Sequence, residues 1–255
     1  MIRAFFKKEF MQLRRTYLLL VVILLMAGAG AISALTIKYM PLIFEMAGMD
    51  ITSLMGGMTF DATASWASYF PNVQQMGLLP LGILMAMDAG KEFRGQALVL
   101  MLGRGLPRRA AVWAKVLIGV LVWTVACLAG GLVCGLFNQA LFGEALMAGL
   151  WASLGYIWLY GILIVVLCVA GCAYMQSISG GLMASGGFLL ITILIGFWPK
   201  AVHYNPASLA SQAPSMLADP STQWDFWPAA AIAVALAAAA MFVATRRYRE
   251  KKTTN

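Results

Sequence analysis

Long stretches without a charged residue constrain this chain more than any other feature. The longest runs from 145 to 199, and other uncharged stretches cover 16–37, 62–87 and 116–143. A helix needs about 20 apolar residues to cross the roughly 30 Å of hydrocarbon in a bilayer. Charged residues make up only 11% of the chain, whereas soluble domains usually carry about 25%. The sequence therefore predicts an all-α integral membrane protein.

The uncharged stretches divide into six predicted transmembrane helices within one membrane domain that covers 1–255. The run from 145 to 199 holds two of them, separated by the polar, glycine-rich turn at 176–181. The apolar run that begins at Tyr17 is too long for the core of a signal peptide, so we expect this segment to be retained. The predicted spans are about 16–37, 66–87, 115–137, 148–174, 180–198 and 226–245.

The positive charges predict the orientation of these spans. Segments 1–15, 88–115 and 246–255 carry five, six and five of the 18 Lys and Arg residues, and only Lys38 and Lys200 lie elsewhere. Cytoplasmic loops of membrane proteins are enriched in Lys and Arg. We therefore expect a multi-pass protein of the cell (plasma) membrane with both termini and the 88–115 connector in the cytoplasm.

Segment 1–15 precedes the first span and has a helical pattern. An apolar face and a basic face favour an amphipathic helix in the inner headgroup layer. The alternative is a basic flank that only sets the topology. The apolar face holds Ile2, Phe6, Phe10 and Leu13, and the basic face holds Arg3, Lys7 and Arg14.

Several kinds of chemistry have no residues to support them. The chain has no G-x-x-x-x-G-K-[ST] phosphate loop and no H-E-x-x-H motif, and His203 is its single histidine. The four cysteines all lie in predicted spans, where small apolar packing residues are expected. A methionine-rich outer segment at 38–75 has no histidine and so favours short surface helices over a copper site. We assign no catalytic, cofactor-binding or metal-binding residue and expect no enzyme activity.

Two further patterns predict local structure. Gly131 and Gly135 form a G-x-x-x-G in the third span, which suits either packing within one chain or dimerisation. Asn205 followed by Pro206 is typical of a helix cap and first turn, so we expect a short outer helix at about 206–212.

The 88–115 connector is where a partner is expected to act. Between 116 and 199 the only charge is Glu144, so the spans offer little for a coupling ion to bind. A transporter of this kind would take its driving force from a cytoplasmic partner. Leu98, Met101 and Leu102 can form an apolar stripe for a partner groove. Glu92, Arg94 and Arg104 can set its register by charge. The alternatives are a solvated loop that only sets the topology and a segment that rests on the membrane surface.

The chain resembles the permease subunits of type-2 ATP-binding cassette (ABC) exporters over nearly its whole length. The connector carries the most specific likeness: an acidic residue, Glu92, near the end of span two, then Gly95 and the aliphatic run 98–102. The chain departs from many relatives in having Gln96 after that glycine and Pro107 within the turn. The remaining matches are Lys8-Glu9-Phe10 at the N-terminus, Arg104-Gly105-Leu106-Pro107-Arg108 and Lys115 in the connector, and Tyr204-Asn205-Pro206 in the last outer segment.

This resemblance implies a cytoplasmic coupling helix between spans two and three. A separate ABC ATP-binding subunit would dock on it, and a second permease subunit, identical or different, would complete the path through the bilayer. No nucleic-acid partner is expected. The alternative function is a non-transporting assembly or scaffold factor for other membrane proteins. The residues expected to couple to the ATPase are Glu92, Arg94, Gly95, Leu98, Met101, Leu102, Arg104, Gly105, Arg108, Arg109 and Lys115.

Overall fold

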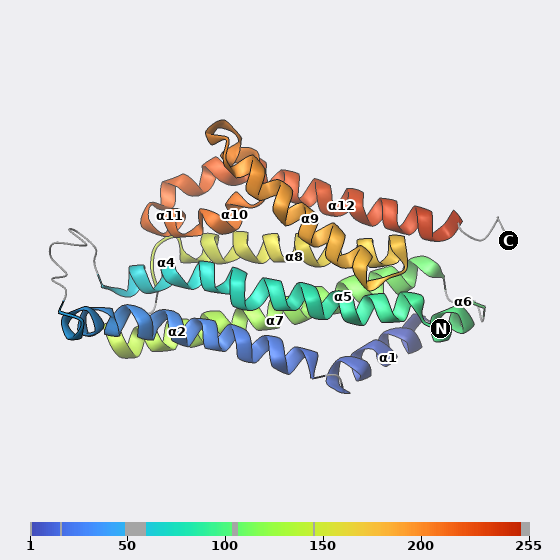
Figure 1. The fold of residues 1–255 in the computed structure, drawn as a ribbon, viewed down its shortest axis with the longest axis horizontal. Helices are drawn as coiled ribbons and strands as arrows, with labels where there is room; N and C mark the ends of the chain where they lie inside the picture. The colour runs from blue at the N-terminus through green and yellow to red at the C-terminus, as the bar shows by residue number, and fades with distance from the viewer. Residues whose placement is uncertain (1, 16, 49–59, 104–106, 145, 251–255) are drawn as a thin grey trace.

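Helices form every regular element of the described part of the chain. The computed structural model describes residues 2–15, 17–48, 60–103, 107–144 and 146–250 (Figure 1). The elements in chain order are α1 (Ile2–Arg15), α2 (Leu18–Met46), α4 (Ala62–Asn72), the π-helical η1 (Val73–Leu78), α5 (Leu79–Arg94), α6 (Gln96–Gly103), α7 (Arg108–Phe142), α8 (Leu150–Met175), α9 (Ile178–Gly196), the 3₁₀-helical η2 (Pro199–Tyr204), α10 (Ser208–Ser211), α11 (Ala213–Ala218), the 3₁₀-helical η3 (Pro220–Phe226) and α12 (Trp227–Glu250).

Five helices in the described part of the chain are long and apolar enough to cross a membrane. They are Leu18–Met46, Arg109–Phe142, Leu150–Met175, Ile178–Gly196 and Trp224–Arg246. The protein is therefore an all-α membrane protein, and five of the six predicted spans have a counterpart among these helices.

The predicted second span, 66–87, has no single long helix as its counterpart. The chain is helical from Ala62 to Arg94, but it is divided into α4, η1 and α5, which follow one another along the bundle (Figure 1). The π-helical stretch lies between Pro71 and Pro80. A proline lacks the backbone N–H and clashes with the carbonyl four residues before it, so the regular hydrogen-bond ladder is interrupted here.

The helix boundaries refine the sequence prediction. Helix α2 continues beyond 37 to Met46, and α7 begins at Arg108, ahead of the predicted 115. The predicted turn at 176–181 is reduced to Gln176 and Ser177. Gln176 adopts a left-handed conformation, and the Ser177 hydroxyl accepts a hydrogen bond from the Gly180 N–H at 3.1 Å to cap α9. Serine is a favoured N-cap for this reason.

The predicted outer helix near 206–212 is confirmed in shortened form as α10 and the adjoining α11. The Asn205 side chain accepts a hydrogen bond from the Ala207 N–H at 3.1 Å, which forms the turn that leads into α10. The same side chain donates to the Thr192 carbonyl at 2.8 Å and so joins this segment to α9. The expected short helices at 38–75 are replaced by the end of α2 and by α4, and residues 49–59 lie outside the described residues.

Helices α2 and α7 pack closely because glycines lie where they meet. A Cβ on Gly30 would stand 2.6 Å from the backbone oxygen of Gly130, so no larger residue fits without a shift of the backbone. The predicted pair Gly131 and Gly135 does not make this contact. A Cβ on Gly131 would meet nothing within 4 Å, and one on Gly135 would meet only the Trp66 ring at 3.7 Å. The close helix packing therefore uses the glycine next to the predicted motif.

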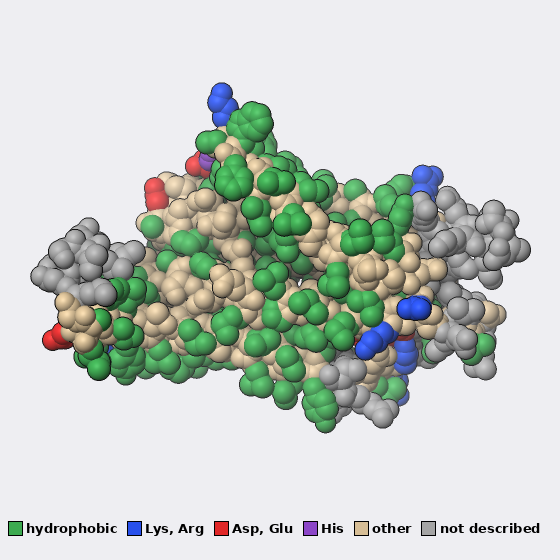
Figure 2. All heavy atoms as spheres, in the orientation of Figure 1, with side chains coloured by type: hydrophobic (Ala, Val, Ile, Leu, Met, Phe, Trp, Pro, Cys, Tyr) green, Lys and Arg blue, Asp and Glu red, His purple; other side chains and the backbone are tan. Residues whose placement is uncertain are grey.

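The charged residues and the short elements lie at the two ends of the bundle. Helices α1 and α6 and the C-terminal end of α12 lie at one end, and α4, α10 and α11 lie at the other (Figure 1). Hydrophobic side chains cover the long flank between the ends, and most of the visible Lys and Arg side chains gather near α1 and α6 (Figure 2). Leu128, Leu132 and Leu136 on α7 are largely exposed, as expected of side chains that face lipid.

Candidate functional site

A buried lysine joins three helices at the end of the bundle that carries α6. Lys115, near the start of α7, has only 1% of its surface exposed. Its Nζ lies 2.7 Å from Oε2 of Glu9 on α1. The same Nζ lies 2.6 Å from Oδ2 of Asp88 and 2.5 Å from Oε2 of Glu92, both on α5. A lysine ammonium has three N–H donors, and here three carboxylates surround it.

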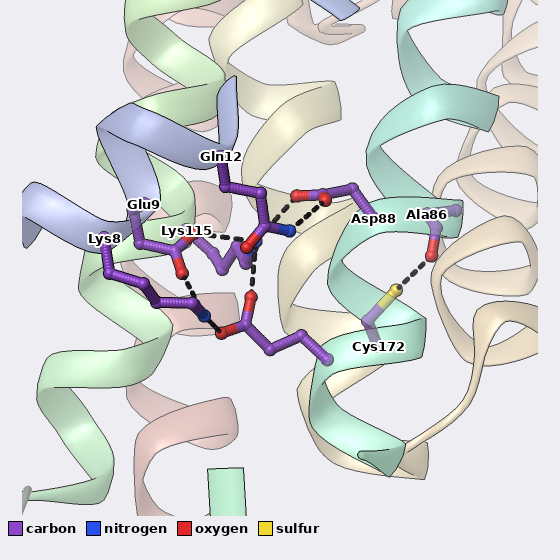
Figure 3. Close-up of polar contacts among 8 residues, drawn as sticks. Lys8, Glu9, Gln12, Ala86, Asp88, Lys115 and Cys172 are labelled. Carbon is purple, nitrogen blue, oxygen red and sulfur yellow. Dashed lines mark hydrogen bonds and ion pairs between the residues drawn. The ribbon is translucent and has the colours of Figure 1, made fainter. Parts of the chain in front are cut away.

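Two more side chains of α1 complete this arrangement. Gln12 donates a hydrogen bond to Oδ1 of Asp88 at 3.0 Å. Lys8 forms ion pairs with Glu9, at 2.9 Å, and with Glu92. Figure 3 shows the side chains of Lys8, Glu9, Gln12, Asp88 and Lys115 converging on one point. We call these six residues, Lys8, Glu9, Gln12, Asp88, Glu92 and Lys115, the Lys115 cluster.

Local helix geometry places each member of the cluster. Asp88 and Glu92 are four residues apart on α5, so they lie on one face of that helix. Lys8 and Gln12 have the same spacing on α1, with Glu9 beside them. Helix α1 packs mainly against α7 and also touches α2. The polar face of α1 is therefore turned toward the bundle, and the Lys7 and Phe10 side chains are exposed.

The charges of the cluster nearly balance. Three carboxylates, on Glu9, Asp88 and Glu92, face two ammonium groups, on Lys8 and Lys115. Burial raises the pKa of Glu9, and the neighbouring charge of Glu92 adds to this effect. Burial alone would also raise the pKa of Glu92, but Lys115 and Lys8 outweigh it and hold that pKa below its ordinary value. A proton taken up by the cluster is thus expected on Glu9.

The pKa of Lys8 depends on the same opposition between burial and paired charges. Burial alone would lower the pKa of Lys8, but hydrogen bonds to Glu92 and Glu9 hold it above the ordinary value of a lysine. Buried charges are costly unless each has a partner, and a buried group that loses its partner destabilises strongly. The Lys115 cluster therefore joins α1, α5 and α7 through paired charges.

The structure brings together two of the residues predicted to couple to an ATPase. Glu92 and Lys115 meet in the Lys115 cluster, where the Glu92 carboxylate is paired with lysines of this chain. The exposed cations Arg94 and Arg109 lie outside the cluster. Gly95 ends α5 in an extended backbone conformation and donates a hydrogen bond from its N–H to the Glu92 carbonyl at 3.0 Å.

The predicted apolar stripe is divided between the interior and the surface. Leu98 is 2% exposed and packs into the hydrophobic core, and Met101 is half-buried. Leu98 therefore packs within this chain, and its contact with an ATPase stays a prediction. Leu100, which the sequence analysis did not select, is 68% exposed on the same short helix. Arg104 and Gly105 lie outside the described residues, as do the side chains of Leu102 and Arg108.

Sequence reasoning missed four members of the cluster. Lys8 and Glu9 entered only through their resemblance to a family motif, and Gln12 and Asp88 were not selected. One signal was available: Asp88 and Glu92 are spaced by one helical turn, and an isolated lysine at the start of a span requires a counter-charge. The sequence does not indicate that α1 would supply the third carboxylate.

The described residues contain no group of three or more His, Cys, Asp or Glu that could hold a metal ion. The three carboxylates of the cluster instead surround the Lys115 ammonium. Comparison of the chain with protein families, with curated proteins and with solved structures found no match.

Proposed function

We propose that this chain is the membrane-spanning permease subunit of an ATP-driven ABC exporter, powered by a separate ATP-binding subunit. In this proposal the helical segment from Ala62 to Arg94 also crosses the membrane, despite its π-helical interruption, and brings the number of crossings from five to six. Six crossings place both termini on one side, and the basic segments make that side cytoplasmic. Helix α6 is then a short cytoplasmic element between two spans.

The Lys115 cluster is the observation that carries this proposal. It lies immediately inside α6 and joins the helix that precedes it, α5, to the helix that follows it, α7. A force applied to α6 would reach both helices together, and Glu9 would carry it to α1. A solvated loop that only sets the topology needs no such joint.

Of the residues that the structure describes, Leu100 is the best placed for contact with the ATP-binding subunit. Among the side chains of α6 that the structure describes, it is the large apolar one that is exposed, and Arg94 and Arg109 are exposed on either side of α6. Full burial of a leucine in a partner groove contributes about 1.5–3 kcal/mol. Exposed cations near such a contact steer and orient an acidic partner.

The test is co-purification from native membranes, with Leu100→Asp as the variant. Leu146→Asp is the matched control, because Leu146 is 70% exposed in the segment between α7 and α8. We expect the parent and the control to retain an ATP-binding subunit and the Leu100 variant to lose it while still inserting. Recovery of the parent with other membrane proteins but no ATPase would instead favour a scaffold, and equal retention by both variants would remove α6 as the docking element.

A further inference from the structure

An open cleft of about 530 Å³ lies beside the Lys115 cluster, between α1, α2, α5 and α6. Along one face of α5, its lining changes from apolar to charged side chains. Leu84 and Met87 are followed by Asp88 and Lys91, at helical spacings of three and four residues. From Leu84 to Lys91 the helix rises by about 10 Å. The cleft therefore has an apolar half and a charged half along the length of α5.

The apolar half continues onto α2. Leu18 and Val21 line the cleft opposite Leu84 and Met87, and Val21 and Met87 are both exposed to the outside. Leu18 and Val21 lie at the start of α2, and Leu84 and Met87 precede the charged end of α5. An alkyl chain placed here would contact apolar side chains on two helices and would still be open to the surrounding lipid.

The charged half carries equal numbers of cations and anions. Lys8 and Lys91 oppose Asp88 and Glu92 on the lining. Lys8 is engaged with Glu92, whereas Lys91 is exposed and makes no ion pair with any residue that the structure describes. Asp88 accepts from Lys115 and Gln12, but a carboxylate has about four acceptor positions. The cleft thus retains one unpaired cation and a carboxylate that can accept further hydrogen bonds.

We propose that this cleft binds an aminophospholipid from the adjacent leaflet. Its phosphate would lie against Lys91, its primary ammonium would donate to Asp88, and an acyl chain would follow Leu18 and Leu84. A choline headgroup fits less well, because a quaternary ammonium has no hydrogen to donate and prefers an aromatic cage, and no aromatic residue lines the cleft. An anionic lipid without an amine has no ammonium to donate to the remaining acceptor positions of Asp88. This inference does not depend on the proposed transport function.

Native mass spectrometry of the delipidated, purified full chain tests the proposal. The probe is an equal mixture of phosphatidylethanolamine, phosphatidylcholine and phosphatidylglycerol with identical acyl chains. We expect the ethanolamine lipid to be retained about tenfold more than either of the others, which is the size expected for one hydrogen bond to a charged group. Equal retention of the choline lipid would overturn the proposal.

Two variants and one competitor sharpen the result. Lys91→Gln should lower the retention of all three lipids, because each of them carries a phosphate, and Lys200→Gln, which removes an exposed charge in η2, should leave retention unchanged. Glycerophosphoethanolamine, the headgroup without acyl chains, should fail to displace the bound lipid. Identical behaviour of the two lysine variants would refute the role of Lys91. Complete displacement by the headgroup alone would show that the apolar half is not used and would refute a lipid site.

Discussion

Replacement of Lys115 by methionine should release α1 from the bundle. Methionine has a similar length and no charge, so the change removes the ammonium and keeps most of the volume. Three carboxylates would then remain with Lys8 as their single cation in the Lys115 cluster. Repulsion between Glu9 on α1 and the two acidic residues of α5 should push the helices apart.

The structure gives the size of this effect. Lys115 is 1% exposed and has three carboxylate oxygens between 2.5 and 2.7 Å from its Nζ. Each contact has a gross attraction of about 6 kcal/mol at an effective dielectric constant near 20. Desolvation of the buried charges offsets most of this, and removal of one partner from a buried ion pair typically costs about 3–5 kcal/mol. We expect a loss of that order.

Thermal unfolding in detergent measures the loss of stability, and tryptic cleavage after Lys7 and Lys8 reports the release of α1. The matched control is Lys38→Met, because Lys38 is exposed and donates only one hydrogen bond, to the Leu141 carbonyl at 3.2 Å. The control should unfold close to the parent and be cleaved at the same rate. A second variant, Lys115→Met with Glu92→Gln, should recover part of the loss because it removes one uncompensated carboxylate.

Unfolding of the Lys115 and Lys38 variants at the same temperature, with equally slow cleavage of α1 in both, would refute this role of Lys115. That outcome would mean that the cluster contributes little net free energy, as a fully compensated buried ion pair can. Destabilisation without any increase in cleavage of α1 would place the loss within α5 and α7. The contacts between α1 and the connector would then contribute no measurable stability.

Three other predictions follow from particular contacts. Glu92→Gln should destabilise the chain more than Glu9→Gln at neutral pH, because their pKa values are lowered and raised, respectively; equal losses in thermal unfolding would contradict this. A raised pKa for Glu9 means that its contribution is present below the ordinary value of about 4.3 and is lost as pH rises through the raised value, so Glu9→Gln should gain stability relative to the parent across that window. Gly130→Ala should cost about 1–3 kcal/mol, since its Cβ would stand 2.7 Å from the Tyr69 hydroxyl and 2.9 Å from the Met26 carbonyl oxygen, whereas Gly131→Ala should be neutral or stabilising; a reversed order in thermal unfolding would refute the packing of α2 on α7.

The sequence alone determined the class of protein and most of its helices. The absence of charge over long stretches is a property of consecutive residues, so it is visible without any fold. The same is true of the turn at Gln176 and Ser177 and of the turn at Asn205, where the residue types directly favour caps. The connector was also located from consecutive residues, because it is a charged segment between two apolar runs. In each case the signal and the structure involve neighbours in the chain.

The tertiary structure decided which side chains of these elements meet. Glu9, Asp88 and Lys115 are far apart in sequence, and no local pattern pairs their charges; the packing of α1 brings them together. Leu98 and Leu100 are both leucines, two positions apart on α6, yet Leu98 is buried and Leu100 is exposed. A helical pattern gives the relative direction of side chains but not the rotation of the helix against its neighbours, and that rotation is set by the packing of the whole bundle.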